Sequence, residues 1–457
     1  MADKAVSLRG EQTVLFTNRQ LVALMWPLLL EQFLAITVGL ADSLMVATVG
    51  DAAISAVSLV DSISNLMIYI FSAMATGGAA VAGQYIGQRQ KEDACHAGQQ
   101  LIALLAVVSV FFVALLYLFR TQILTVMFGH IEPDVMAATN TYYLYVMASI
   151  PGIALYNGGA ALWRTMGRSD ISLKVSLLMN GINVAGNAIL IFGFGMDVAG
   201  VAIPTLVSRT VAAAVILGML FNDKLTLHLS NVRAFRLDMR LMKNIFYIGV
   251  PSGVENGMFH LGRLVLFSLI STFGTAAMVA NAIGNTIANF NCFSGSAINL
   301  GLAAVVSQCV GAGEFDQARA YLRKIVKWTY GIMAVVNLTI IALLPLIMRV
   351  YNVSPEAEKL AVTVSLIHGI SSIFLWIPAF TIPSFLRAAG DAQFTMLASM
   401  TTMWLVRVLL AYILGKYMGY GVVGVWVAHA IVDWSVRSII FYHRYRGGKW
   451  KQMGIKA

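Results

Sequence analysis

The chain has 457 residues, of which 59% are hydrophobic and 11% are charged, and its formal net charge is +10. An average soluble domain carries about 25% charged residues, so this chain lacks the charge that a water-facing surface needs. The composition therefore excludes a cytosolic enzyme, a disordered chain, a fibrous protein and a secreted disulfide scaffold. We expect a polytopic membrane protein whose main solvent is lipid.

The three cysteines, Cys95, Cys292 and Cys309, have no metal-ligand spacing and are too few for a disulfide framework. We expect them to be small packing residues, and we expect no cofactor. The first apolar stretch is long and follows a polar, charged start, so we expect no cleavable signal peptide.

Twelve stretches are long and apolar enough to cross a bilayer as helices, since a spanning helix needs about 20 mostly apolar residues. Their approximate limits are 22–47, 53–76, 98–119, 137–160, 172–193, 199–221, 245–271, 277–303, 326–350, 360–383, 394–415 and 422–443. The sequence thus predicts an all-α polytopic membrane protein with twelve transmembrane helices.

The distribution of lysine and arginine predicts the orientation of these helices. With both termini in the cytoplasm, most of the 31 basic residues fall in inner segments, such as the run from Lys224 to Lys243. The outer loops contain only Arg120, Arg349, Lys359 and Lys416. This bias follows the positive-inside rule. The net positive charge is therefore explained by membrane topology, and no nucleic-acid partner is expected. We expect an integral protein of the plasma (cytoplasmic) membrane.

The second half of the chain repeats the first at a constant offset. Corresponding pairs are Pro27 and Pro251, Glu31 and Glu255, Gly77 and Gly301, Gln84 and Gln308, and Gly87 and Gly311. Six spans separate the copies, so the second copy returns to the orientation of the first. The repeat predicts two parallel six-helix bundles related by a pseudo-twofold axis along the membrane normal.

Paired parallel bundles are an architecture of secondary transporters, with a binding cavity near the midplane and alternating access by rocking. We expect an N-terminal lobe at 1–221, a cytoplasmic linker at 222–243 and a C-terminal lobe with a short basic tail at 244–457. A channel fits less well, because the sequence contains no filter-like loop. We expect a transporter that acts as a monomer.

Asp42 is the acid within the spans that most needs an explanation. A charge at the bilayer centre costs upwards of roughly 2.5 kcal/mol, so such acids are functional candidates. No basic residue of the first span can neutralise Asp42. It could therefore exchange a proton or, with oxygen-bearing neighbours, hold a sodium ion. The alternative is an acid bonded to backbone at a helix end.

Oxygen-bearing side chains of three other spans fall at the depth of Asp42. Asn183 and Asn187 share one face of the fifth span, and Tyr143 and Thr205 lie at matching depths in the fourth and sixth. The second copy has Leu266, Arg407, Ala411 and His429 where the first has Asp42, Asn183, Asn187 and Thr205. A purely structural cluster would be expected in both copies, so we predict a cation-coupling site in the first.

Further polar residues lie within the spans. Glu31 and Glu255 occupy matching positions near the inner ends of spans one and seven, which favours a structural role, such as pairing with inner-loop arginines, over gating. Asp433 and Arg437, at i and i+4, are expected to neutralise each other. A polar group in the second half could line a water-filled cavity or join helices; its members are His260, Arg263, Asn281, Asn285, Asn289 and Arg407.

Several local patterns occur in the order found in one transporter family. They are GLADSLM at 39–45, GQYIG at 83–87, LWRTMG at 162–167, NVAGN at 183–187 followed by Phe192 and Gly193, and VAGVA at 198–202. With the twelve spans, they make the chain resemble the multidrug and toxic compound extrusion (MATE) transporters over residues 20–443.

The resemblance implies export of cationic or amphipathic organic compounds in exchange for H⁺ or Na⁺. It also implies that Asp42, Tyr143, Asn183, Asn187 and Thr205 match the family's first-lobe cation site. Family members commonly have aspartate where this chain has Asn187, which leaves Asp42 as the only anionic ligand expected there. Some members carry an acid in span seven where this chain has Phe259 and His260, so Glu255 does not take that role.

Two other functions stay open from the sequence. A flippase for lipid-linked oligosaccharide would have a similar helix count, and Arg263 and Arg407 could receive a pyrophosphate group. A polytopic membrane transferase fits less well, because the loops are short and contain no paired carboxylates, metal-ligand spacing or nucleotide motif. A cation-coupled multidrug antiporter is the leading hypothesis.

Overall fold

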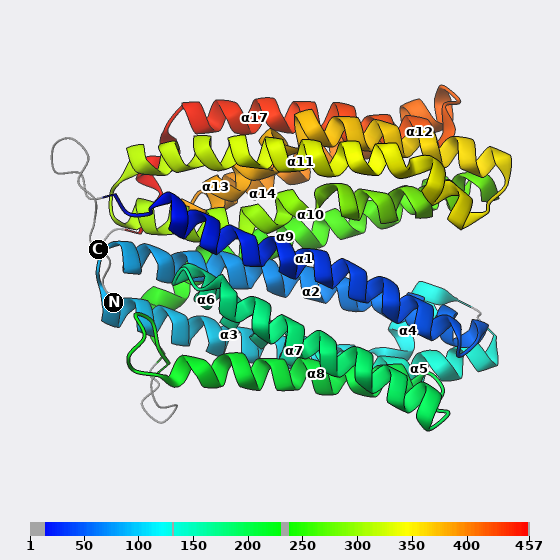
Figure 1. The fold of residues 1–457 in the computed structure, drawn as a ribbon, viewed down its shortest axis with the longest axis horizontal. Coiled ribbons are helices and arrows are strands. Elements are labelled where there is room, and N and C mark those ends of the chain that lie inside the picture. Colours follow the sequence, from blue (N-terminus) through cyan, green and yellow to red (C-terminus); the bar gives the residue numbers. More distant parts are fainter. Residues whose placement is uncertain (1–13, 130–131, 230–236, 456–457) are drawn as a thin grey trace. The chain divides into compact units, whose positions relative to one another are not determined.

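The computed structural model describes residues 14–129, 132–229 and 237–455, and every regular element in these ranges is helical (Figure 1). The first half contains α1 (Asn18–Ala47), α2 (Asp51–Gly87), α3 (Lys91–Leu118), α4 (Arg120–Phe128), α5 (Pro133–Ala148), α6 (Ile150–Thr165), α7 (Ser169–Ala188), η1 (Ile189–Gly193), α8 (Ala199–Gly218) and η2 (Met219–Phe221).

The second half contains α9 (Met239–Ser271), α10 (Thr275–Gly311), α11 (Phe315–Tyr351), α12 (Pro355–Ser371), η4 (Ser372–Thr381), α13 (Ile382–Ala388), α14 (Ala392–Thr401), η5 (Thr402–Val408), α15 (Leu409–Ala411), η6 (Tyr412–Tyr417), α16 (Gly421–Val427), η7 (Ala428–Asp433), α17 (Trp434–Arg446) and η8 (Lys449–Gln452). The predicted all-α polytopic class is confirmed.

The predicted spans coincide with long helical segments, and ten such segments of the described chain are long and apolar enough to cross a membrane. The predicted span 137–160 is divided between α5 and α6 at Ser149. Pro151 explains the division, because it has no N–H to bond to the carbonyl of Met147. Helices also continue past the apolar stretches, as α2 does to Gly87, since backbone hydrogen bonding does not require apolar side chains.

Most of the π-helical segments lie in the second half, at η4, η5, η6 and η7. A π turn adds one residue to a helical turn, changes the direction of the side chains around it and is frequent at functional sites. Arg407 lies on η5 and Asp433 on η7, so two of the buried charged residues of the second half lie on these irregular turns.

The chain divides into two compact units. The first unit consists of Leu30–Ala82 and Gln90–Gly257, and the second of Met1–Leu29, Gly83–Arg89 and Met258–Ala457. The beginning of α1 therefore belongs to the second unit, and the beginning of α9 to the first. The lobe boundary expected at 222–243 stays a prediction, and its residues 230–236 lie outside the described ranges.

The N-terminal parts of α1 and α9 make equivalent contacts, each within its own unit. In the first unit, a Cβ on Gly77 of α2 would lie 3.1 Å from the Cα of Gly249 of α9. In the second unit, a Cβ on Gly301 of α10 would lie 2.5 Å from the sulfur of Met25 of α1. Gly301 is the repeat counterpart of Gly77, and Gly249 is that of Met25, so the repeat is present in the packing as well as in the sequence.

The core of the first unit positions the predicted site. Helix α6 packs against α3 and α8, and the buried Trp163 donates from Nε1 to the carbonyl of Ile216 at 3.3 Å. Helices α7 and α8 lie side by side along their length (Figure 1). This pair carries three of the predicted site residues.

Candidate functional site

Four of the predicted site residues meet in the first unit. Asn187 Nδ2 donates to Asp42 Oδ1 at 2.9 Å. The amide nitrogen of Asn183, turned to the same carboxylate, donates to Oδ1 at 3.1 Å and to Oδ2 at 2.9 Å. In that orientation the amide oxygen of Asn183 accepts from Thr205 Oγ1 at 3.2 Å. Two amides on one face of α7 therefore hold the carboxylate of α1.

This cluster forms because α7 and α8 approach closely. Asn183 and Asn187 are four residues apart and share one face of α7. Between them lies Gly186, where a Cβ would come within 2.7 Å of the Cβ of Pro204 on α8. Thr205 follows Pro204 in the chain, so the close contact at Gly186 also brings the Thr205 hydroxyl to Asn183.

Tyr143 does not contact this cluster. Its hydroxyl donates to the carbonyl of Leu116 on α3 at 2.8 Å. The neighbouring Tyr142 directs its hydroxyl to Asp61 Oδ1 on α2 at 3.2 Å. Consecutive helical residues point about 100° apart, so depth along a span cannot distinguish the two. The role of Tyr143 in cation coupling therefore stays a prediction.

Two charged residues that the sequence interpretation did not connect with Asp42 interact with it. Asp61 on α2 repels the Asp42 carboxylate, and Arg209 on α8 attracts it. Arg209 also attracts Asp61, and its Nη1 donates to Ser149 Oγ at 2.8 Å. The sequence showed that both charged residues lie inside predicted spans. One sequence alone does not show which face of each helix carries them.

The cluster around Asp42 contains an amide oxygen that could act as a cation ligand. Asn187 Oδ1 is buried and has no hydrogen-bond partner in the described part of the chain. A buried acceptor without a partner is costly. In the described ranges no three His, Cys, Asp or Glu side chains are grouped to hold a metal ion. A sodium ion would therefore depend on amide and hydroxyl oxygens beside Asp42.

The polar residues predicted to line a cavity in the second half fall into separate environments. Asn281 is buried, and its Oδ1 accepts from Trp426 Nε1 at 3.2 Å. Asn285 Nδ2 donates to the carbonyl of Asn281 at 2.9 Å, which is a contact within α10. Of the others, Arg407 is buried, His260 is partly buried, and Asn289 and Arg263 are exposed. The cavity-lining role stays a prediction.

A cluster of buried rings in the second unit was not predicted. Neighbouring ring centroids of His368, His429, Trp426 and Trp434 are between 5.1 and 5.8 Å apart. Asn291 approaches His368, with Asn291 Nδ2 lying 3.0 Å from His368 Nδ1. These rings come from α12, η7, α16 and α17, so their grouping depends on tertiary packing that periodicity does not reveal.

Charged residues are also buried in the second unit. Asp433 is attracted electrostatically by both Arg437 and Arg407, and the mutual neutralisation of Asp433 and Arg437 stays a prediction. Arg437 also packs over the rings of Phe259 and Phe380, at 4.8 and 4.7 Å from their centroids. Such cation–π contacts compensate part of the desolvation of a buried guanidinium.

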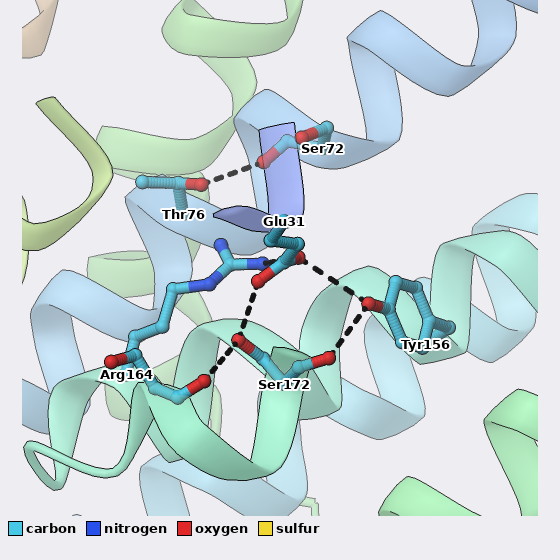
Figure 2. Close-up of polar contacts among 7 residues, drawn as sticks. Glu31, Ser72, Thr76, Tyr156, Arg164 and Ser172 are labelled. Atoms are coloured by element: carbon cyan, nitrogen blue, oxygen red, sulfur yellow. Dashed lines mark hydrogen bonds and ion pairs between the residues drawn. The ribbon is translucent and has the colours of Figure 1, made fainter. Parts of the chain in front are cut away.

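Glu31 lies in a buried polar network of the first unit (Figure 2). Arg164 Nη2 is 3.5 Å from Glu31 Oε1, Ser172 Oγ donates to Oε2 at 2.7 Å, and the Tyr156 hydroxyl donates to Oε1 at 3.4 Å. The network joins α1, α6 and α7, an arrangement suited to the expected structural role. Glu255, its counterpart in the repeat, is likewise buried.

The helical fold and the buried carboxylate–amide cluster define the class of the protein, an integral membrane transporter. The MatE family model matches residues 27–189 and 251–413, and the chain belongs to this family of multidrug efflux transporters. The two matches begin at Pro27 and at its repeat counterpart Pro251, so the internal repeat is confirmed. Members of the family are transporters, which agrees with the expectation that the chain is not an enzyme and sets the transferase alternative aside.

Similar proteins extend over nearly the whole chain. The uncharacterized transporter YisQ of Bacillus subtilis (strain 168) is 29% identical over 95% of each chain. A probable multidrug resistance protein NorM of Thermotoga maritima is 23% identical over 96% of this chain and 94% of its own.

Solved structures show the same fold. An outward-facing multidrug resistance MATE family transporter of the MOP superfamily aligns with a TM-score of 0.85 and 18% identity over 95% of this chain and 96% of its own. A MOP superfamily transporter from Pyrococcus furiosus aligns over the same shares with a TM-score of 0.86 and 18% identity.

Proposed function

We propose that this protein exports cationic or amphipathic organic compounds across the cell membrane in exchange for H⁺ or Na⁺. It would work as a monomer by alternating access, with both termini in the cytoplasm. The observation that carries this proposal is the carboxylate of Asp42, held inside the first unit by Asn183 and Asn187. An ionisable group kept within a membrane-embedded unit is costly unless it serves binding or transport.

The two asparagines suit a site that is alternately empty and occupied. An amide offers both N–H donors and an oxygen acceptor. Towards an empty carboxylate, Asn183 and Asn187 present N–H groups, as they do here. Towards a bound cation, the same side chains would present oxygens. Turning these amides changes the contacts between α1, α7 and α8, and a cation that fits one arrangement better shifts the protein towards it.

Transport by purified protein in proteoliposomes tests the proposal. Ethidium, a monovalent organic cation, is loaded on one side, and proton and sodium gradients are imposed separately. The parent should exchange ethidium against one of the two gradients, and Asp42→Asn should lose that dependence. Asp197→Asn, which changes an exposed acid in the loop before α8, is the matched control and should behave as the parent. Equal gradient-driven transport by Asp42→Asn and the parent would contradict the coupling role.

A flippase for lipid-linked oligosaccharide is the second candidate function. It is favoured by Arg407, a buried cation of the second unit that could contribute to binding a pyrophosphate. Complementation of a flippase-deficient strain separates the two candidates, because an antiporter for organic cations should fail to restore growth there.

A further inference from the structure

We propose that residues 453–455 form a strap that holds the end of α2 within the second unit, and that this strap is released each time a substrate enters from the cytoplasm. The role rests on the proposed function, because only a protein that alternates access must separate its helix ends on one side of the membrane.

The strap follows a firm anchor, Trp450 of η8. Trp450 is fully buried, and its ring packs edge-on against Phe315 of α11 and Phe385 at centroid distances of 5.7 and 4.8 Å. It also stacks parallel to the ring of Tyr445 on α17. A buried tryptophan contributes a large apolar contact area, so the chain enters the strap from a fixed position.

The strap is hydrogen-bonded to the end of α2 through both backbone groups of Ile455. The N–H of Ile455 donates to Gln84 Oε1 at 2.7 Å, and Gln88 Nε2 donates to the carbonyl of Ile455 at 2.9 Å. Gln84 lies in the last turn of α2 and Gln88 directly follows the helix. Gln84 Nε2 also donates to the carbonyl of Ala388 at 3.1 Å. The amide of Gln84 therefore joins the strap, α2 and α13.

The backbone of the strap fits closely against the surrounding helices. A Cβ on Gly454 would lie 2.9 Å from Cγ1 of Val310 on α10. A Cβ on Gly390, in the turn after α13, would lie 2.4 Å from the carbonyl oxygen of Met453. The strap thus lies between α10 and the end of α13, and it encloses the end of α2 together with them.

Helix α2 makes this contact mechanically important. It begins in the first unit, and residues 83–89, which include its end, belong to the second. The distribution of basic residues predicts that this end faces the cytoplasm. When access alternates, the end of α2 can leave the second unit only if the bonds of Gln84 and Gln88 to Ile455 break.

These bonds are suited to reversible release. Gln88 and Ile455 are half-buried, so water can replace their hydrogen bonds at a small net cost. Trp450 has no such substitute for its ring contacts. Residues 453–455 can therefore detach and return while the anchor stays in place.

A reversible cross-link tests whether the strap must be released. In a background with the three native cysteines replaced by serine, Gln88→Cys/Ile455→Cys is treated with a bismaleimide whose spacer contains a disulfide. Ethidium exchange is then measured in proteoliposomes under the gradient that drives the parent. The cross-linked protein should lose exchange and regain it when dithiothreitol cleaves the spacer. Both single-cysteine variants, treated in the same way, should keep exchange.

A second cross-link within the same unit is the matched control. Arg444 Nε lies 2.7 Å from Asp391 Oδ2, a contact that joins α17 to the turn before α14 and does not involve α2. Cross-linked Asp391→Cys/Arg444→Cys should therefore exchange ethidium before and after reduction.

Removing the strap should have the opposite effect to cross-linking it. Deletion of residues 453–457 leaves Trp450 in place and should lower the cytoplasmic ethidium concentration for half-maximal export several-fold, because more of the protein is open to the cytoplasm at rest. Gln88→Ala should shift this concentration in the same direction. Gln452→Ala, which changes an exposed glutamine of η8, is the control and should leave it unchanged. A strap that served packing alone would lower the unfolding midpoint and leave the half-maximal concentration unaltered.

The outcomes distinguish the strap from the proposed function. If the cross-linked Gln88→Cys/Ile455→Cys protein exchanges ethidium as fast as its reduced form, release is not needed and the role of the strap is wrong, while the proposed function stands. If the parent exchanges ethidium for neither cation, the proposed function fails and the role of the strap fails with it. Should the deletion variant fail to fold, as judged by size-exclusion chromatography, the cross-link still decides.

Discussion

Gly87 and Gly311 each lie against the main chain of the other's helix. A Cβ on Gly87, at the end of α2, would lie 2.1 Å from the carbonyl oxygen of Gln308 on α10. A Cβ on Gly311, at the end of α10, would lie 2.0 Å from the carbonyl oxygen of Gln84 on α2. Gly87 and Gly311 are counterparts in the repeat, as are Gln84 and Gln308. The two helix ends therefore cross at a contact that is symmetric under the repeat.

Substituting alanine at either position should destabilise the protein. A methyl group cannot fit where a carbonyl oxygen lies within 2.1 Å of it, so the helix ends must move apart at a cost of about 1–3 kcal/mol. Gly87→Ala and Gly311→Ala should each lower the midpoint of thermal unfolding in detergent by several degrees. Gly331→Ala is the control, because nothing lies within 4 Å of its Cβ position on α11. An unchanged midpoint in Gly87→Ala would contradict the contact.

The fold was largely predictable because lipid imposes a simple rule on sequence. Each span must be apolar over about 20 residues, so the positions of the helices could be read directly. The division at Ser149 and the π-helical turns of the second half could not, since they depend on how Pro151 and neighbouring helices satisfy individual backbone groups. The assignment of the first turns of α1 and α9 to separate compact units likewise follows from packing.

Removing the charge of Glu31 should destabilise the first unit. Arg164 is buried against this carboxylate, and an uncompensated buried cation costs about 3–5 kcal/mol. Glu31→Gln should therefore lower the unfolding midpoint in detergent strongly. Glu31→Gln/Arg164→Met, which removes both charges, should lose less than the single variant.

The exposed ion pair between Arg168 and Asp170, 3.2 Å apart, gives the control. Asp170→Asn should cost less than about 1 kcal/mol, since exposed pairs contribute little. A double variant of Glu31 and Arg164 that is less stable than Glu31→Gln would show that the two charges are not compensating each other.

Replacing Tyr142 and replacing Tyr143 with phenylalanine should have different effects on ethidium exchange. Tyr142→Phe removes a donor from the carboxylate of Asp61, and a hydrogen bond to a charged group contributes about 1.5–3 kcal/mol. If the Asp61 carboxylate takes part in cation binding, its loss of this donor should make it bind the cation more tightly, and the cation concentration for half-maximal ethidium exchange should fall at least about tenfold. Tyr143→Phe should lower stability by about 1 kcal/mol and leave this concentration unchanged. The reverse pattern would support the predicted place of Tyr143 in the cation site.

The site was predictable in part. Asp42 and the two asparagines of α7 were identifiable because charge is scarce in the spans and because residues four apart share a helix face. Choosing between Tyr142 and Tyr143 required the rotation of α5, which depth does not give. Asp61 and Arg209 were visible as intramembrane charges, but their relation to Asp42 depends on which faces of α2 and α8 are turned inward. Side-chain direction is set by packing, and one sequence does not determine it.

Alanine at the two asparagines should reveal the coupling ion by the sign of its effect. Asn187→Ala removes both the donor to Asp42 and the unpartnered oxygen. If sodium is the coupling ion, a ligand is lost, and the half-maximal concentration should rise about thirtyfold for about 2 kcal/mol. If the proton is the coupling ion, the carboxylate loses a stabilising donor, and protonation should be half-complete at a lower proton concentration.

Asn183→Ala should shift the half-maximal cation concentration in the same direction as Asn187→Ala. Asn140→Ala is the control, because Asn140 donates to the carbonyl of Met136 on its own helix, and it should leave the cation dependence of ethidium exchange unchanged. Opposite shifts in Asn183→Ala and Asn187→Ala would show that the two amides do not serve one carboxylate.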